Sequence, residues 1–312
     1  MRVWQVLAMR LFTAVAAIAA SCFPGVVCAQ FTDPRTYTPG PVGLNYLEFD
    51  YTYARANASI DTSLVVGAAT LELNKGALSY THNFNALDHF AWVNATVPFA
   101  SVRGLVAENN VSASASGAGD SSLEFAGLLK GGEALTAAEL ATHERRTSVG
   151  MSVTVTVPTG EYNADKVLNL GTHRWSFKPE IGVAYPFGVE QKWEVDGYIN
   201  AFFFTDNTAY HGVEVLRQEP LLGVEGHLSY SATQSFWASL DTRYAWRGET
   251  VVDGLAQNNS QQDLIVGAEV HWLPNSHNSL GLVFAKALVH RSAPDYTGVV
   301  VKYAYSWGKD SR

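Results

Sequence analysis

Apolar and polar residues alternate one by one along most of the chain, most clearly between Arg146 and Phe204. Three segments of this stretch place apolar side chains on one face and polar or small side chains on the other. This period of two is the pattern of a β-strand with one face in water. The apolar faces carry Val149, Met151, Val153, Val155 and Val157, then Trp175, Phe177, Ile181, Val183 and Tyr185, and then Trp193, Val195, Ile199, Ala201 and Phe203.

The same pattern recurs before and after this stretch. Strands of about ten residues, with aromatic residues at the ends of the apolar face and charge on the other face, are typical of a transmembrane barrel with a wet lumen. We therefore predict an all-β fold, a transmembrane antiparallel up-and-down β-barrel of about 12 strands. The expected strands are 44–55, 69–84, 89–98, 122–130, 148–157, 174–185, 192–204, 220–230, 236–247, 263–272, 278–286 and 297–307.

The connections between these strands also form a pattern. Short turns at 85–88, 186–190, 231–234 and 273–278 fall at every second junction, and longer polar segments fall at the others. Outer-membrane barrels have short periplasmic turns and long external loops. We therefore expect both ends of the barrel domain to face the periplasm.

Three connecting features have their own predictions. Pro98 should end its strand, because proline cannot continue a central ladder. Residues 102–122 are rich in Asn, Ser, Ala and Gly, and we expect a long loop there. Residues 131–144 have helical composition, and Thr136 and Glu139 have the spacing of a capping box. A short periplasmic helix and a plug inside the barrel are both compatible with this last segment.

Composition supports a membrane barrel. Only 16% of the residues are charged, against about 25% in soluble domains, while 47% are apolar. A barrel needs apolar side chains at alternate positions only, so it lacks the long apolar runs of helical membrane proteins. The net charge of -8 argues against a nucleic-acid partner.

The first 29 residues read as a secretory signal peptide, with Arg2 and Arg10 flanking an apolar run and small residues before Gln30. Cleavage after Ala29 would also remove Cys22 and Cys28. We therefore divide the chain into a signal peptide at 1–29, a periplasmic N-terminal segment at 30–43, and an outer-membrane barrel with a short C-terminal tail at 44–312. Outer-membrane lipids and the outer-membrane barrel assembly machinery are the expected partners.

The runs VPTGEY, NLGTHRWSFKPEIGVAY and FFFTDN, together with FWASLDTRYAWRGE and the closing VVVKYAYSW, resemble an outer-membrane family associated with the meta-pathway of phenol degradation. Members of that family are described as transporters. The resemblance implies a substrate that is aromatic or otherwise hydrophobic. It carries over no catalytic residue.

Candidate site residues are the polar side chains on the inward faces. They would line the lumen, either as structural networks of charges or as the path of a solute. Asp263 shares this face. The residues assigned to the lumen path are Glu180, Glu194, Asp196, Asn200, Glu225, His227, Asp241, Arg243, Glu269 and His271.

The function that needs fewest assumptions is a channel or diffusion facilitator for small molecules, hydrophobic or aromatic ones among them. No catalytic motif, cofactor site or metal-ligand spacing is present, so we do not expect an enzyme. Two alternatives stay open. An outer-membrane hydrolase would pair His227 or His271 with a serine such as Ser229 or Ser239, and a structural or adhesive barrel would have a closed lumen.

Overall fold

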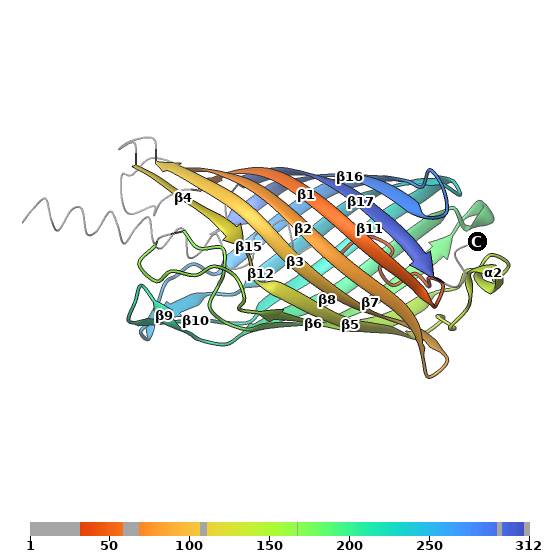
Figure 1. Cartoon of the computed structure of the whole chain (residues 1–312), viewed down its shortest axis with the longest axis horizontal. Coiled ribbons are helices and arrows are strands. Elements are labelled where there is room, and N and C mark those ends of the chain that lie inside the picture. The colour runs from red at the N-terminus through yellow and green to blue at the C-terminus, as the bar shows by residue number, and fades with distance from the viewer. Residues whose placement is uncertain (1–31, 59–68, 107–110, 167, 292–294, 309–312) are drawn as a thin grey trace, which may run out of the picture.

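Twelve long antiparallel strands close into a barrel in the computed structural model, which describes residues 32–58, 69–106, 111–166, 168–291 and 295–308 (Figure 1). The barrel sheet has 13 strands, and all of them except β4 (Val111–Ala118) belong to the closed ring. The signal peptide expected at 1–29 and the tail after Gly308 lie outside the described residues. The ring consists of β1 (Leu44–Ala58), β2 (Ala69–Ala86), β3 (His89–Val106), β5 (Ser121–Lys130), β6 (Ser148–Val157), β7 (Ser176–Phe187), β8 (Trp193–Phe204), β11 (Leu221–Thr233), β12 (Phe236–Arg247), β15 (Gln261–Trp272), β16 (Asn278–Arg291) and β17 (Asp295–Gly308).

The ring closes between its first and last strands. Leu44 of β1 pairs with Gly308 of β17, and the antiparallel register continues to Asn57 and Asp295. Because each strand also pairs with its neighbour in the chain, the ring has no free edge. The prediction of an up-and-down barrel of about 12 strands is confirmed.

The alternation assigns the two faces correctly. On β6, Val153 is 37% exposed on the outer surface whereas Ser152 is buried at 5%. Ile181 and Ile199 on the next two strands are also exposed, at 51% and 63%. An outer surface of bare Val, Ile, Leu and Phe suits contact with lipid, since apolar side chains gain nothing from facing water.

Aromatic residues mark both ends of this outer surface. Tyr185, Trp193 and Tyr230 lie near the short turns, and the rings of Trp193 and Tyr230 are 4.7 Å apart between centroids. Trp175 and Tyr244 lie at the opposite ends of their strands. These positions match the two aromatic girdles of outer-membrane barrels. The other members are Trp246, Trp272, Tyr305 and Trp307.

All the predicted short turns lie at one end of the barrel, which we call the turn end; the opposite end is the loop end. The turn end also holds α2 (Ala137–Leu140), at the right in Figure 1. Thr136 and Glu139 form the predicted capping box, and none of the helical residues is buried. The segment 131–144 therefore contains a short helix that is not a plug. No helix in the described part of the chain is long and apolar enough to cross a membrane.

Two predictions about the loop end are wrong. Pro98 lies within β3, which continues to Val106, and residues 111–118 form β4. Pro98 is tolerated because β3 changes partner beside it: β5 pairs with β3 up to Thr96, and β4 pairs from Phe99 onwards. A missing N–H donor costs little where the ladder is already interrupted. The described parts of this region, 102–106 and 111–122, are therefore mostly strand and not a long loop.

The loop end also carries a second, smaller sheet. It is built from two connections, and the expected polar loop between β12 and β15 contributes half of it. Figure 1 shows β9 and β10 at this end of the barrel, away from α2. The four strands are β9 (Asn207–Tyr210), β10 (Glu214–Gln218), β13 (Thr250–Val252) and β14 (Leu255–Ala256).

Candidate functional site

The lumen contains the chain's own N-terminal segment, residues 32–43, which we call the plug segment. At the turn end, the backbone N–H of Gly43 donates to the carbonyl of Asn83 at the rim. Deeper in the barrel, the N–H of Thr32 donates to Glu225 Oε2 at 2.9 Å. The sequence division placed residues 30–43 before the barrel as a periplasmic segment. The described part, 32–43, instead runs from the rim into the lumen.

Tyr37 is the most deeply packed residue of the plug segment. Its side chain is fully buried, at 0% exposure. Gly150 of β6 and Gly182 of β7 leave a notch for its ring, because a methyl group built on either glycine would overlap that ring. Tyr198 closes the notch from β8, with its ring centroid 5.3 Å from that of Tyr37.

Hydrogen bonds complete the seat of Tyr37. Its hydroxyl lies 3.1 Å from both Ser152 Oγ and Glu180 Oε1. Its main-chain carbonyl accepts a bond of 2.6 Å from Ser148 Oγ. Each polar atom of a buried tyrosine needs such a partner to offset its loss of water. The plug segment is thus held both by shape and by polar contacts.

Arg35 connects the plug segment to the adjoining part of the lumen wall, on β8, β11 and β12. Its Nε donates to Ser229 Oγ at 2.9 Å, and its backbone N–H donates to Asp196 Oδ2 at 3.2 Å. The guanidinium lies over the ring of Trp237, 4.6 Å from the centroid. Trp237 in turn stacks on His271, with ring centroids 4.4 Å apart.

Asp33 makes the main ion pair between plug and wall. Its Oδ1 lies 2.6 Å from Nζ of Lys302 on β17. Lys302 is buried, and its ammonium is also 3.5 Å from Glu269 Oε1. Burying an ammonium group costs free energy through lost hydration, and attraction to nearby carboxylates offsets that cost. The ion pair is stable only because the partners are close and hydrogen-bonded.

The ten predicted lumen residues lie on the less exposed faces of their strands. Nine of them are buried, and His271 is half-buried. Asp263, on the same predicted face, is also buried. The structure brings several of them together: Asn200 Nδ2 donates to Glu180 Oε2 at 3.0 Å and to Glu225 Oε1 at 2.9 Å. Whether a solute passes along these side chains stays a prediction.

A cavity of about 590 Å³ lies in the lumen beside the plug segment. Asp33 and Thr36 of the plug segment form part of its wall, and strands from both halves of the barrel form the rest. His227 and Asp241 also line it, joined by a bond of 2.8 Å between His227 Nδ1 and Asp241 Oδ1.

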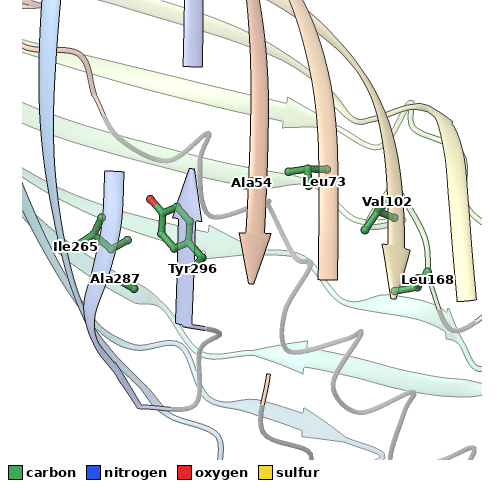
Figure 2. Packing of buried hydrophobic residues seen from close by; sticks show 7 residues of the cluster. All are labelled: Ala54, Leu73, Val102, Leu168, Ile265, Ala287 and Tyr296. Carbon is green, nitrogen blue, oxygen red and sulfur yellow. The ribbon is translucent and has the colours of Figure 1, made fainter. Parts of the chain in front are cut away.

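Towards the loop end the inner wall becomes apolar. Figure 2 shows seven buried hydrophobic residues facing the interior from separate strands and from one loop. Leu168, of the connection between β6 and β7, belongs to this cluster although it follows no strand pattern. We call this group the apolar cluster. Its members are Ala54, Leu73, Val102, Leu168, Ile265, Ala287 and Tyr296.

The residues that sequence reasoning missed belong mainly to the plug segment and its notch. Tyr37, Asp33 and Arg35 lie outside every predicted strand, so no periodic pattern marks them. Gly150 and Gly182 were assigned to the inward face, but only as small residues. The only sequence feature that pointed to them was the excess of carboxylates over cations on the predicted inward faces, because such a lumen wall needs cations or hydrogen-bond donors from another segment.

Comparisons with known proteins agree with this architecture. A family model described as "Putative MetA-pathway of phenol degradation" matches residues 53–302. An outer membrane channel from Pseudomonas putida is similar over 89% of this chain and 100% of its own, with a TM-score of 0.76 and 21% identity. The transport unit of the autotransporter AIDA-I from Escherichia coli has a TM-score of 0.54 and 10% identity, over 95% of this chain and 98% of its own. A comparison with curated proteins gives no match.

Proposed function

We propose that this chain, a member of the family described by the MetA-pathway of phenol degradation, forms a passive outer-membrane channel for small molecules with an apolar body, aromatic compounds among them. The observation that carries the proposal is the cavity of about 590 Å³ between the plug segment and the apolar cluster. A barrel with a purely structural or adhesive role would be expected to fill this space with side chains.

The apolar cluster supports a solute that is not a hydrated ion. Apolar constrictions in a pore exclude water, and an ion would have to shed its hydration to pass one. A molecule with an apolar body pays no such cost, because transfer from water to an apolar surface is favourable. The aromatic part of the proposal rests on the description of the family.

The plug segment supports a regulated passage. It runs through the lumen from the rim of the turn end to Glu225, so a solute in the cavity would leave more easily on that side if the segment shifted. Its contacts with the wall are hydrogen bonds, the Asp33–Lys302 ion pair, the Arg35–Trp237 contact and one aromatic ring in a notch. All of these can be broken without disturbing the strand ladders. We infer that barrel and plug are separate parts, with the plug setting the rate of passage.

The hydrolase alternative finds little support in the geometry. A serine nucleophile needs a histidine within hydrogen-bond reach to take its proton. Ser239 Oγ instead donates to Asp241 Oδ2 at 3.1 Å, and Ser229 Oγ accepts from Arg35. Ser279 Oγ is 3.5 Å from His271 Nδ1, which is too long for a strong bond.

Liposome swelling with the purified mature barrel tests the proposal. Phenyl glucoside and glucose form a matched pair, because they share the sugar that limits passive leakage and differ in the aromatic body. We expect faster swelling with phenyl glucoside than with glucose, and little with potassium chloride. Equal rates with and without the protein for both sugars would refute the channel, as would cleavage of esters that His227→Ala abolishes.

A further inference from the structure

One wall of the lumen cavity holds more negative than positive charge. Lys302 is in contact with the carboxylates of Asp33 and Glu269. Asp50 of β1 lies directly opposite Lys302 in the strand register, where facing side chains are close neighbours. Glu48, two residues before it, lines the same cavity. Four carboxyl groups therefore gather around one ammonium group.

Counting the next neighbours does not remove this excess. Lys75 of β2 lines the cavity and adds one positive charge. Lys178 and Arg174 also line it and add two more, while Asp120, Glu124 and Asp241 add three negative charges, so these further groups balance and the excess around Lys302 remains. Buried carboxylates are stable only when cations or hydrogen-bond donors compensate them. The cavity therefore has room for a further donor or cation.

Two atoms in the cavity wall independently indicate the kind of group that is missing. His227 is 3% exposed, and its Nε2 has no hydrogen-bond partner among the residues that the structure describes. Its Nδ1 bonds the Asp241 carboxylate, which can only accept, so Nδ1 carries a proton; when the ring is neutral, Nε2 is therefore an acceptor. Asp50 Oδ1 is likewise a buried acceptor without a hydrogen bond.

The cavity wall also has apolar surface among polar side chains such as Thr96 and Thr154. Trp92, Phe202 and Val283 line the cavity from three different strands. A molecule in this space would therefore meet hydrogen-bond acceptors and negative charge as well as ring and aliphatic surface. An ammonium group joined to an aromatic or short aliphatic body matches both kinds of surface, because the cation compensates the carboxylates while the body buries apolar surface.

We propose that this cavity is a binding site for a small organic cation, with Asp50 and Glu48 of β1 as partners for the ammonium group and His227 of β11 as a further acceptor in the cavity wall. This inference rests on the proposed function for the route by which the solute arrives, and it adds the charge class of that solute. The site itself does not require transport, so binding can be measured separately.

Calorimetry with the detergent-solubilised mature barrel tests the site. Benzylammonium, benzyl alcohol and benzoate are matched probes that have similar bodies and differ in charge. Charge-assisted hydrogen bonds are roughly twice as strong as neutral ones, so we expect benzylammonium to bind about tenfold more tightly than benzyl alcohol. Benzoate should bind most weakly. Asp50→Asn should remove most of the preference, whereas Asp88→Asn, the same change in an exposed turn, should leave it intact.

Equal affinity for the three probes in the unaltered barrel would overturn the proposal, and so would a preference for benzoate. If Asp50→Asn fails to give a heat-modifiable barrel, Glu48→Gln provides the second variant, and the probe series on the unaltered barrel decides by itself. Selective binding of benzylammonium without any solute-driven swelling would refute the channel but keep the site. Swelling with phenyl glucoside, together with equal binding of the three probes, would refute the cation site but keep the channel.

Discussion

Replacing Tyr37 by alanine is expected to release the plug segment from the lumen. The Tyr37 ring is fully buried in the notch formed by Gly150 and Gly182, and its hydroxyl lies close to Ser152 and Glu180. Removing a large buried aromatic side chain costs about 3–5 kcal/mol. Here that free energy is lost from docking of the segment and not from the strand ladders, because Tyr37 belongs to no strand.

A loss of this size lowers the ratio of docked to undocked plug by roughly two to four powers of ten, since each 1.4 kcal/mol is a factor of ten. Glu180 keeps its wall partners Lys178 and Asn200 after the segment leaves, so its carboxylate is not left unpaired. Tyr37→Phe is the matched control. It keeps the ring in the notch and loses only bonds worth about 1 kcal/mol, so it should remain largely docked.

Thiol labelling can follow the docked state. Ser229 is completely buried beneath Arg35, so a cysteine introduced as Ser229→Cys should react with a charged maleimide only when the segment leaves. We expect rapid labelling and faster swelling in the Tyr37→Ala background, and slow labelling with Tyr37→Phe. A Tyr37→Ala barrel that folds but keeps the introduced thiol unreactive and the swelling rate unchanged would refute this account of the plug.

Three further predictions follow from the faces, the notch and the helix cap. Val153→Arg should block assembly, because a charge on the lipid face costs roughly 2–4 kcal/mol at mid-bilayer, while Thr154→Arg should be tolerated in the lumen; equal yields of heat-modifiable barrel would mean that the faces are reversed. Gly182→Ala should displace the Tyr37 ring and raise swelling rates towards those of Tyr37→Ala, and unchanged rates would contradict the notch. Bonds from the backbone N–H and hydroxyl of Thr136 lower the pKa of Glu139. The cap should therefore be intact above the usual carboxyl range and open as the pH falls through this lowered pKa, which an NMR titration of Glu139 with Thr136→Ala as control would measure.

The faces of the strands could be predicted from sequence because a strand has an exact period of two. Once the lipid side of β8 is identified from Val195 and Ile199, the lumen side must hold Glu194, Asp196 and Asn200. The closed ring leaves no other place for them. The two-residue period alone therefore predicts which strand residues are buried. It gives no information on which side chains are in contact.

The loop end was harder to predict because its strands lack a strong apolar face. β4 has the sequence VSASASGA, in which alanine alternates with serine, so its composition resembles that of a loop. Ala113 and Ala115 nevertheless pack against the apolar cluster. Alanine is large enough at these positions because the larger side chains of the apolar cluster fill most of the space. Since alanine is only weakly hydrophobic, the alternation of apolar and polar residues along β4 is hard to recognise in the sequence. The prediction that Pro98 ends its strand was wrong for a related reason, since the sequence of β3 alone does not show that its partner strand changes beside Pro98.

The plug segment lay beyond prediction because periodicity gives the direction of a side chain but not its partner. Tyr37 meets Ser148, 111 positions later in the chain, and Thr32 meets Glu225, 193 positions later. What the alternation did reveal was a lumen wall with many carboxylates and few cations. Such a wall cannot stay dry and unpaired, because buried charges need compensation.

The cations and hydrogen-bond donors that compensate these carboxylates lie both on the strands and on segments outside them. Arg35 of the plug segment bonds Asp196 through its backbone, and Arg145 of the connection before β6 pairs with Glu194. An acidic excess on the inward face of a predicted barrel is therefore evidence that a segment without periodicity enters the lumen. Around Lys302 the same reasoning still finds more carboxylates than cations after the plug has been placed, which is why the remaining space there is better explained by a cationic solute than by empty volume.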